Sequence, residues 1–367
     1  MESIVTSVDL DRRHVQLPAM SVVSPDVGAR GDVKLQATLR FAVGITAAFV
    51  VSEMMQWSPS FIAPMLTTVL LSNIPIRPPL KMALGLVIVM TVTSVFAFVI
   101  ASLLHDTPTI LFGLIGLCVF LAFYVMLSGK PALPPLLLLI CLATIPVLVM
   151  VAPKQAGAMP VALVRGMAVA LVTIWLVYLP WPLTAPPKPA PAGAPIKDAR
   201  VAMALAGVAV VMPLMLVYLL FGLADVLPVM IATVMLVANF DLNRGRAQAL
   251  GMIVGNFAGG LLGLLLHTLL LALPTLPFLA GMLFVVMLGF GQRIIAGGPL
   301  AGVAVLTCNA TLFILSSAIS SDSASLSLWL VRVFQFSLAG AFSVGMMSLV
   351  WYRATHTPPA KHSPDRR

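Results

Sequence analysis

The chain has 367 residues, of which 60% are hydrophobic and 9% are charged, and its mean hydropathy is +1.08. Soluble domains carry about 25% charged residues, so this composition excludes a soluble globular protein and indicates a chain that lies mostly in a lipid bilayer. Basic loops on one side of a membrane explain the formal net charge of +9, and we expect no nucleic-acid partner.

Apolar segments of about 20 residues recur along the chain and predict an all-α membrane protein with about twelve transmembrane helices. The predicted segments are residues 36–57, 58–75, 79–104, 107–129, 133–153, 159–181, 199–222, 226–240, 246–272, 274–294, 297–320 and 325–351. Several joints carry helix breakers, such as Pro78-Pro79 and Gly297-Gly298. The second and eighth segments are short, which predicts that they are tilted, broken or only partly inserted.

The chain divides into two helical halves joined by a linker. Residues 182–196 contain six prolines, which favours an extended, semi-rigid connection. The N-terminal segment has no apolar core, so we expect no cleavable signal peptide. The expected division is a tail at 1–35, a first six-helix repeat at 36–181, the linker at 182–198, a second six-helix repeat at 199–351 and a tail at 352–367.

The two halves resemble each other when the sequence is shifted by 166 residues. This shift places Asn73 on Asn239, Ala83-Leu84-Gly85 on Ala249-Leu250-Gly251 and Pro108 on Pro274, and one further residue of shift places Arg165 on Arg332. Because each half has six predicted spans, both halves enter the membrane from the same side. We therefore predict two parallel repeats related by an axis along the membrane normal, as in many transporters.

Lysine and arginine predict the orientation. All but three of the 21 basic residues fall on the side of the two termini, the exceptions being Lys154, Arg165 and Arg332. Cytoplasmic loops carry the excess of basic residues, so we expect both termini to be cytoplasmic and the chain to be a multi-pass protein.

Four glycines, at positions 251, 255, 259 and 263, follow one another every fourth residue in the ninth segment. At 3.6 residues per turn they share one face of a helix, and small residues allow helices in a bilayer to pack closely. We expect this face to pack against the matching helix of the first half, residues 79–104.

Arg165 and Arg332 are the strongest candidates for substrate binding. A charged residue inside a span costs about 3 kcal/mol and usually faces the protein interior. Two arginines brought together by a pseudo-twofold axis would repel unless an anion lay between them, and guanidinium groups suit carboxylates. In the other interpretation, each arginine extends to the outer interface. Asn256 and Asn309 contact the substrate or form hydrogen bonds between helices.

Glu53 is a candidate for proton coupling, because it is the only acid clearly within a predicted span. Its alternative role is that of a surface carboxylate near Gln56 and Trp57. A polar cytoplasmic mouth is predicted from Asn73, Arg77, Lys81, Asn239, Asp241, Arg244 and Arg246. These residues attract anionic substrates or only anchor the loops on the cytoplasmic side.

No motif for catalysis or nucleotide binding is present in the sequence. It contains no G-x-x-x-x-G-K-[ST], and Cys118, Cys141 and Cys308 lie in apolar runs with no metal-ligand or disulfide spacing. We therefore expect neither an enzyme nor a cofactor or metal site. We expect transport driven by an ion gradient, by the gradient of the substrate itself or by a partner protein.

Over residues 36–351 the chain resembles the fusaric-acid-resistance (FUSC-like) superfamily. In the first half the resemblance rests on F-I-A-P-M-L-T-T-V-L-L followed by Arg77, Lys81 and Gly85; in the second it rests on V-L-P-V-M-I-A-T-V-M-L followed by Arg244, Arg246, Gly251 and Gly255. Larger members carry soluble cytoplasmic regions, whereas this chain has only the proline-rich linker. The plant aluminium-activated malate channels are more distantly similar.

The resemblance implies a bacterial inner-membrane exporter of organic anions, especially aromatic carboxylic acids, that works with a periplasmic membrane-fusion adaptor protein. Three other functions remain open. A passive organic-anion channel would conduct without a proton gradient, and a major-facilitator-like multidrug transporter would share the six-plus-six arrangement. A membrane scaffold or lipid-handling protein would need neither arginine to face the interior.

Overall fold

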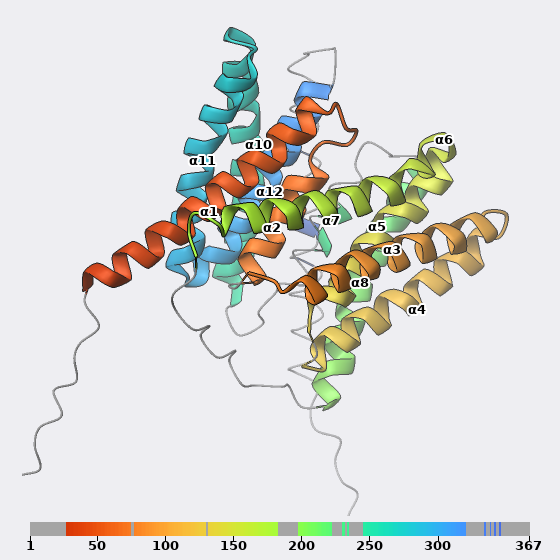
Figure 1. Ribbon diagram of the computed structural model, residues 1–367. Helices are drawn as coiled ribbons and strands as arrows, with labels where there is room; N and C mark the ends of the chain where they lie inside the picture. Colours follow the sequence, from red (N-terminus) through yellow and green to blue (C-terminus); the bar gives the residue numbers. More distant parts are fainter. Residues whose placement is uncertain are drawn as a thin grey trace, which may run out of the picture.

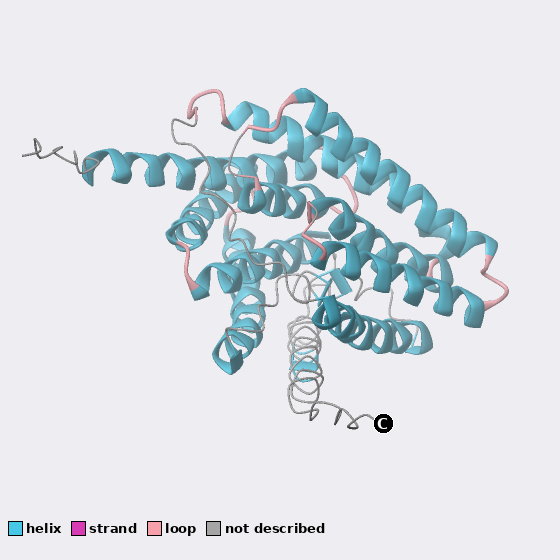
Figure 2. Ribbon diagram, turned by 90° about the horizontal axis from the view of Figure 1, so that it is seen from below, coloured by secondary structure: helices cyan, strands magenta, loops and turns pink. Residues whose placement is uncertain are grey.

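The computed structural model describes residues 27–74, 77–129, 131–182, 197–221 and 245–320, with isolated residues at 230–231, 233–234, 334, 338, 341–342 and 345. Its regular secondary structure over these residues is helical, without strands (Figure 2). The helices are α1 (Val27–Met54), α2 (Ile62–Asn73), α3 (Leu80–Leu103), α4 (Pro108–Leu127), α5 (Leu133–Val151), α6 (Pro153–Ala156), α7 (Ala158–Val177), α8 (Lys197–Phe221), α10 (Gly245–Ala272), α11 (Leu276–Ala296) and α12 (Pro299–Ser320).

Nine helices in this described part of the chain are long and apolar enough to cross a membrane. The protein is therefore a multi-pass membrane protein. The short second segment is confirmed as short: α2 has 12 residues, and all nine from Ile62 to Leu70 are buried. The predicted spans at 226–240 and 325–351 lie largely or wholly outside the described residues, so the count of twelve stays a prediction.

The first helix begins at Val27, whereas the sequence analysis expects its start at residue 36. Asp32, Lys34 and Leu35, which lie within the extra length of the helix, are exposed. Hydropathy locates the apolar part of a helix, not its end, because charged residues continue a helix readily once it has left the bilayer. The expected N-terminal tail at 1–35 therefore overlaps the start of α1 at residues 27–35.

Figure 1 shows α10, α11 and α12 as one group and α3, α4, α5 and α8 as another, with α1, α2 and α7 between them. Within the groups, α3 packs on α5 and α10 packs on α12. Helix α5 is apolar on all sides and is the most completely buried of the membrane-length helices, as expected for a helix at the centre of a bundle.

Helices α1 and α8 each pack in a hydrophobic core formed largely by helices distant in the chain, and α1 also packs against α2 and α7. Phe41, Ile45 and Phe49 of α1 lie in an apolar cluster with Leu283 of α11 and residues of α12, whereas α8 contributes Val210 and other buried residues to the large cluster built mainly from α2 to α5 and α7. Accordingly, α1 packs against α11 and α8 packs against α4. The chain thus exchanges α1 and α8 between two cores.

A glycine permits close approach at each of the two exchanged contacts. A Cβ atom on Gly291 of α11 would lie 3.2 Å from Phe41 Cδ1 of α1, and a Cβ atom on Gly207 of α8 would lie 2.7 Å from Phe123 Cδ2 of α4. In both places a phenylalanine ring of one helix lies against the bare backbone of the other.

The four glycines of α10 lie against α12, which differs from the expected partner, α3. Cβ atoms on Gly255 and Gly263 would lie 2.8 Å from Val303 Cγ1 and 2.9 Å from Ile314 Cβ, and one on Gly259 would overlap the Thr307 carbonyl oxygen. The Thr311 hydroxyl of α12 also donates to the Gly259 carbonyl oxygen at 3.1 Å. The expectation was wrong because a stripe of small residues predicts close packing but does not identify the partner helix.

Candidate functional site

A hydrogen-bonded group of polar side chains lies where α1 ends and the chain turns into α2. The turn begins at Gln56, whose φ of 53° stops the helix, and the Trp57 amide donates back to the Ser52 carbonyl at 3.0 Å. This turn carries Trp57 and Ser60 close to Glu53, which lies in the last turn of α1.

Glu53, Ser60 and Ser316 form a hydrogen-bonded chain. Ser60 Oγ donates to Glu53 Oε1 at 2.5 Å, and Ser60 Oγ lies 2.6 Å from Ser316 Oγ of α12. A serine hydroxyl has one proton; because Ser60 gives its proton to Glu53, Ser316 is the donor in the second bond. Both serines are buried, at 3% and 2% exposed, so the two hydroxyls connect the carboxylate of α1 to a helix of the second half.

Arg165 of α7 lies at the same corner, with its guanidinium carbon 4.4 Å from the centre of the Trp57 ring. The close approach depends on the next residue, since a Cβ atom on Gly166 would lie 2.5 Å from Ile62 Cγ2 at the start of α2. Within the described residues, no carboxylate forms an ion pair with Arg165. The ring face offsets part of the cost of holding a cation in a span, typically by about 0.5–2 kcal/mol.

Asn256 and Asn309 are buried, at 3% and 7% exposed. Neither polar atom of the Asn309 side chain, nor Asn256 Oδ1, has a hydrogen-bond partner in the described structure. A buried polar group left without a partner costs about 1–3 kcal/mol, and such groups usually contact a ligand or water.

Asn309 lies on the same face of α12 as the two residues, Phe313 and Ser316, that contact the turn between α1 and α2. Asn309, Phe313 and Ser316 are spaced four and three residues apart, so they share a face. The Phe313 ring meets the edge of Phe61 with ring centres 5.0 Å apart, and Ser316 is bonded to Ser60. Along this face, Phe313 and Ser316 meet the start of α2, and the Asn309 amide lies about two helical turns away from Ser316.

A second polar cluster surrounds the C-terminal end of α7, thirteen residues or roughly 20 Å along the helix from Arg165. Arg40 of α1 is buried and donates to the Trp181 carbonyl oxygen at 2.9 Å. Its guanidinium carbon also lies 4.7 Å from the centre of the Tyr178 ring. Cations are favoured at helix C-termini because the last carbonyl groups lack partners within the helix, so Arg40 fixes α1 to this end of α7.

Part of the predicted cytoplasmic mouth lies beside this second cluster. Asn73, Arg77 and Lys81 are exposed around the turn between α2 and α3. The side-chain amide nitrogen of Asn73 donates to the Val69 carbonyl within the last turn of α2 at 2.8 Å. The guanidinium carbon of Arg77 lies 5.5 Å from the centre of the Trp175 ring. The remaining predicted mouth residues, Asn239, Asp241, Arg244 and the Arg246 side chain, lie outside the described residues, as does Arg332.

Sequence reasoning missed Arg40, Ser60 and Ser316. Arg40 is recognisable in principle, because it stands inside the predicted span beside the apolar run that starts at Phe41. The two serines carry no such signal, since an isolated serine in an apolar segment usually bonds to its own helix. Their role depends on which helices the fold brings together.

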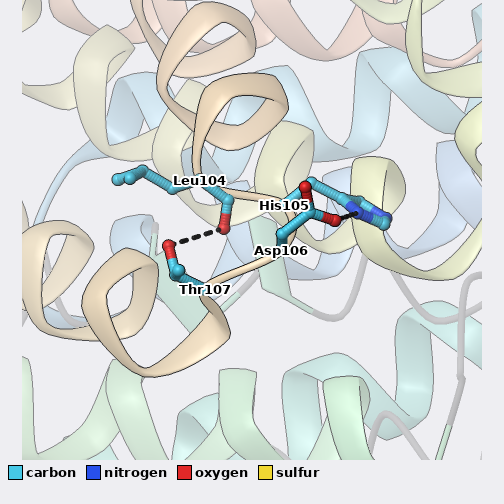
Figure 3. Close-up of polar contacts among 4 residues, drawn as sticks. All are labelled: Leu104, His105, Asp106 and Thr107. Carbon is cyan, nitrogen blue, oxygen red and sulfur yellow. Dashed lines mark hydrogen bonds and ion pairs between the residues drawn. The ribbon is translucent and has the colours of Figure 1, made fainter.

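The turn between α3 and α4 contains an exposed acid–base pair. His105 Nδ1 lies 3.5 Å from Asp106 Oδ1, and Thr107 Oγ1 lies 3.5 Å from the Leu104 carbonyl oxygen (Figure 3). Among the residues that the structure describes, no three histidine, cysteine, aspartate or glutamate side chains gather as a metal site would require. This pair therefore belongs to the surface of a connecting turn.

Replacing Trp175 with alanine is expected to destabilise the protein by about 2–3 kcal/mol. The indole Nε1 donates to the Pro78 carbonyl at 3.1 Å, and the ring lies under Arg77, so the change removes a hydrogen bond, a cation–π contact and packing area. Thermal unfolding in detergent measures the effect. Leu176→Ala is the matched control because Leu176 is 59% exposed; equal losses from the two changes would contradict the anchoring role of Trp175.

A family model described as a protein of unknown function (DUF2955) matches residues 37–177. The match begins within α1 and ends at the last residue of α7, so it covers the first helical half and less than half of the chain. No curated protein and no solved structure matches the chain. The recognised unit contains Glu53, Trp57 and Arg165.

Proposed function

We propose that the protein is a secondary transporter of organic anions, with aromatic carboxylates as the preferred cargo, and not an enzyme. The observation that carries this proposal is the turn between α1 and α2 in a membrane-spanning bundle, where Trp57 carries Arg165 on its ring face and Ser60 belongs to the Glu53–Ser60–Ser316 chain. Ionisable residues inside membrane spans are costly and usually mark the path of a substrate or proton.

The chemistry of the corner suits an aromatic carboxylate. A guanidinium group without a carboxylate partner among the described residues can bind an oxyanion through two parallel hydrogen bonds, and aromatic faces receive a flat ring. Phe61 and Phe313 meet within the same region, and the unpaired Asn309 amide on the same face of α12 supplies a further donor and acceptor. Asn256 is the corresponding candidate on α10.

The proposed architecture is two parallel six-helix repeats with twelve spans, as in the FUSC-like superfamily. The exchange of α1 and α8 between the cores supports this proposal, because a pseudo-twofold axis would relate the α1–α11 contact to the α8–α4 contact. The shift of 166 residues carries Phe41 onto Gly207, and it carries Phe123 onto Gly289, two residues before the Gly291 that meets Phe41. In this architecture Arg332 is the counterpart of Arg165.

We further propose that the protein lies in the bacterial inner membrane with both termini cytoplasmic. The corner at Glu53 then faces the outer side, and Arg40, Arg77 and Lys81 lie at the cytoplasmic mouth. An exporter in this orientation would pass its cargo to a periplasmic membrane-fusion adaptor, as the resemblance implies. The basic mouth would raise the local concentration of anions before they enter the path.

Transport in proteoliposomes tests the function. Purified protein is reconstituted, and the movement of radiolabelled benzoate, fusaric acid and malate is followed with and without an imposed pH gradient, beside protein-free liposomes. We expect saturable accumulation of the two aromatic acids that depends on the gradient. Equilibration without accumulation would replace the transporter with a passive channel. No protein-dependent movement of any of the three anions would overturn organic-anion transport.

Changing Glu53 to glutamine is expected to abolish accumulation driven by the pH gradient while the protein still folds. Glutamine keeps the shape and still accepts the Ser60 hydrogen bond but cannot exchange a proton. We expect a loss of gradient-driven accumulation of about 100-fold or more, the lower end of the effect of removing a proton-transfer group. Asp106→Asn is the control, since that acid lies fully exposed in the α3–α4 turn. An unchanged pH dependence in Glu53→Gln would remove Glu53 from the coupling step.

A further inference from the structure

We propose that Ser60 and Ser316 relay protons to and from Glu53, so that the carboxyl group exchanges its proton through α12 of the second half. The proposal rests on the proposed function, because it specifies how the coupling residue of that transporter is reached. Its starting point is the pair of short hydrogen bonds, 2.6 Å between the serines and 2.5 Å from Ser60 to Glu53.

The relay moves one proton without leaving a charge on either serine. A hydronium ion in the transport path gives a proton to Ser316 Oγ and becomes water; Ser316 passes its own proton to Ser60, and Ser60 passes its proton to Glu53 Oε1. Three O–H bonds form and three break, both hydroxyls end with one proton each, and the ionised carboxylate becomes a neutral acid. The reverse sequence releases the proton.

The hydrogen bonding of Ser316 is unusual for a buried hydroxyl in this protein. Ser52, Thr67 and Thr144 each donate to the carbonyl four residues earlier on their own helix, at 2.8 Å, which is the ordinary arrangement in a helix. Within the described structure, Ser316 Oγ is bonded instead to a hydroxyl on another segment of the chain. A buried serine in a helix can satisfy its hydroxyl by donating to a carbonyl of its own helix, so the bond from Ser316 to Ser60 is not required for burial.

Within the described residues, the side-chain hydrogen bond to Glu53 comes from Ser60 and not from a charged or titratable group on a neighbouring helix. On α7, Arg165 lies over the Trp57 ring. On α11, Arg293 lies in the last turn, at the end remote from Glu53. On α10, which packs against α12, His267 is buried. Helix α2 contains no charged residue.

The relay also requires that α12 stay packed against the turn between α1 and α2. Ser60 and Ser316 meet only while α12 lies against the turn between α1 and α2, and 256 residues separate them along the chain. Movement of the two halves relative to each other would break the contact and isolate Glu53. Proton exchange would then be confined to one conformation, which is the requirement for coupling it to transport.

Infrared difference spectroscopy of the reconstituted protein tests the relay independently of any cargo. The Glu53 carboxyl band is identified by its absence in Glu53→Gln, and its rate of hydrogen–deuterium exchange is then measured. We expect Ser60→Ala and Ser316→Ala to slow this exchange on the order of ten-fold or more and Ser316→Thr, which keeps the hydroxyl, to restore it. Ser52→Ala is the control: it removes an equally buried hydroxyl at the same end of α1.

Wild-type exchange rates in both folded alanine variants would overturn the relay, as would a Glu53 carboxyl that does not titrate across the accessible pH range. If an alanine variant fails to fold, Ser316→Cys provides a second variant of similar size with a much weaker donor, and undiminished exchange in it counts equally against the relay. Slowed exchange together with no transport of any anion would retain the relay and reject the proposed function. Normal transport by the wild-type protein, together with wild-type exchange rates in the alanine variants, would retain the proposed function and reject the relay.

Discussion

Replacing Gly259 with leucine is expected to drive α10 away from α12 and to destabilise the protein by about 3 kcal/mol or more. Any Cβ atom at this position would overlap the Thr307 carbonyl oxygen and lie 2.9 Å from Ala310 Cβ. A backbone oxygen in a helix cannot rotate aside as a side chain can, so the whole helix must move. The change also threatens the hydrogen bond from Thr311 to the Gly259 carbonyl.

Gly281→Leu is the matched control on the neighbouring helix α11. Gly281 is exposed, and a Cβ atom there would meet nothing within 4 Å, so the better helix propensity of leucine should leave stability unchanged or raise it by up to about 1 kcal/mol. Thermal unfolding in detergent, monitored by size-exclusion chromatography, measures both variants. Equal stability of the two would show that α10 and α12 are not held by this glycine face.

The positions of the helices were largely predictable from the sequence because the bilayer constrains them. A span must be about 20 residues long and apolar, and prolines or glycines mark several of the turns. The start of α1 was not predictable in this way. A helix that leaves the membrane can continue through Asp32 and Lys34, since water tolerates charged side chains that the bilayer excludes.

The partners of the helices were not predictable, because apolar faces in a bilayer are nearly interchangeable. The glycines of α10 indicated a close contact, but only the structure identifies α12 as the partner. Likewise, nothing in the local sequence of α1 indicates that Phe41 packs against Gly291 of α11. Packing in membranes depends on the match between two surfaces far apart in the chain, and one surface alone does not reveal it.

For the candidate site, charge was the useful signal. Glu53 and Arg165 were identifiable because an ionisable residue in a span is expensive, and the structure finds both at the corner where α1 meets α2. The serines were not identifiable from the sequence, because a buried hydroxyl group usually bonds to a carbonyl of its own helix and so gives no sign of a functional role. Their hydrogen bond arises from tertiary contact, because the fold brings the turn between α1 and α2 against α12.

Changing Arg165 to glutamine is expected to reduce the transport of aromatic carboxylates by about 10- to 100-fold without reducing the amount of folded protein. A hydrogen bond to a charged group contributes about 1.5–3 kcal/mol, which corresponds to this range at about 1.4 kcal/mol for each factor of ten. Glutamine retains a polar side chain on the Trp57 ring but loses the positive charge. Initial rates in proteoliposomes, measured over a range of cargo concentrations, check the expectation.

Two further variants separate cargo binding from simple anchoring of α7. Lys154→Gln removes one positive charge from the exposed segment just before α7 and is expected to leave transport unchanged. Arg165→Lys keeps the charge but loses the planar fork that suits a carboxylate, so transport should recover only in part. If Arg165 merely holds α7 by its contact with Trp57, Arg165→Gln will lower the unfolding temperature and leave the affinity for cargo intact. In that case the guanidinium group is an anchor, and the binding site must be sought along the Asn309 face of α12.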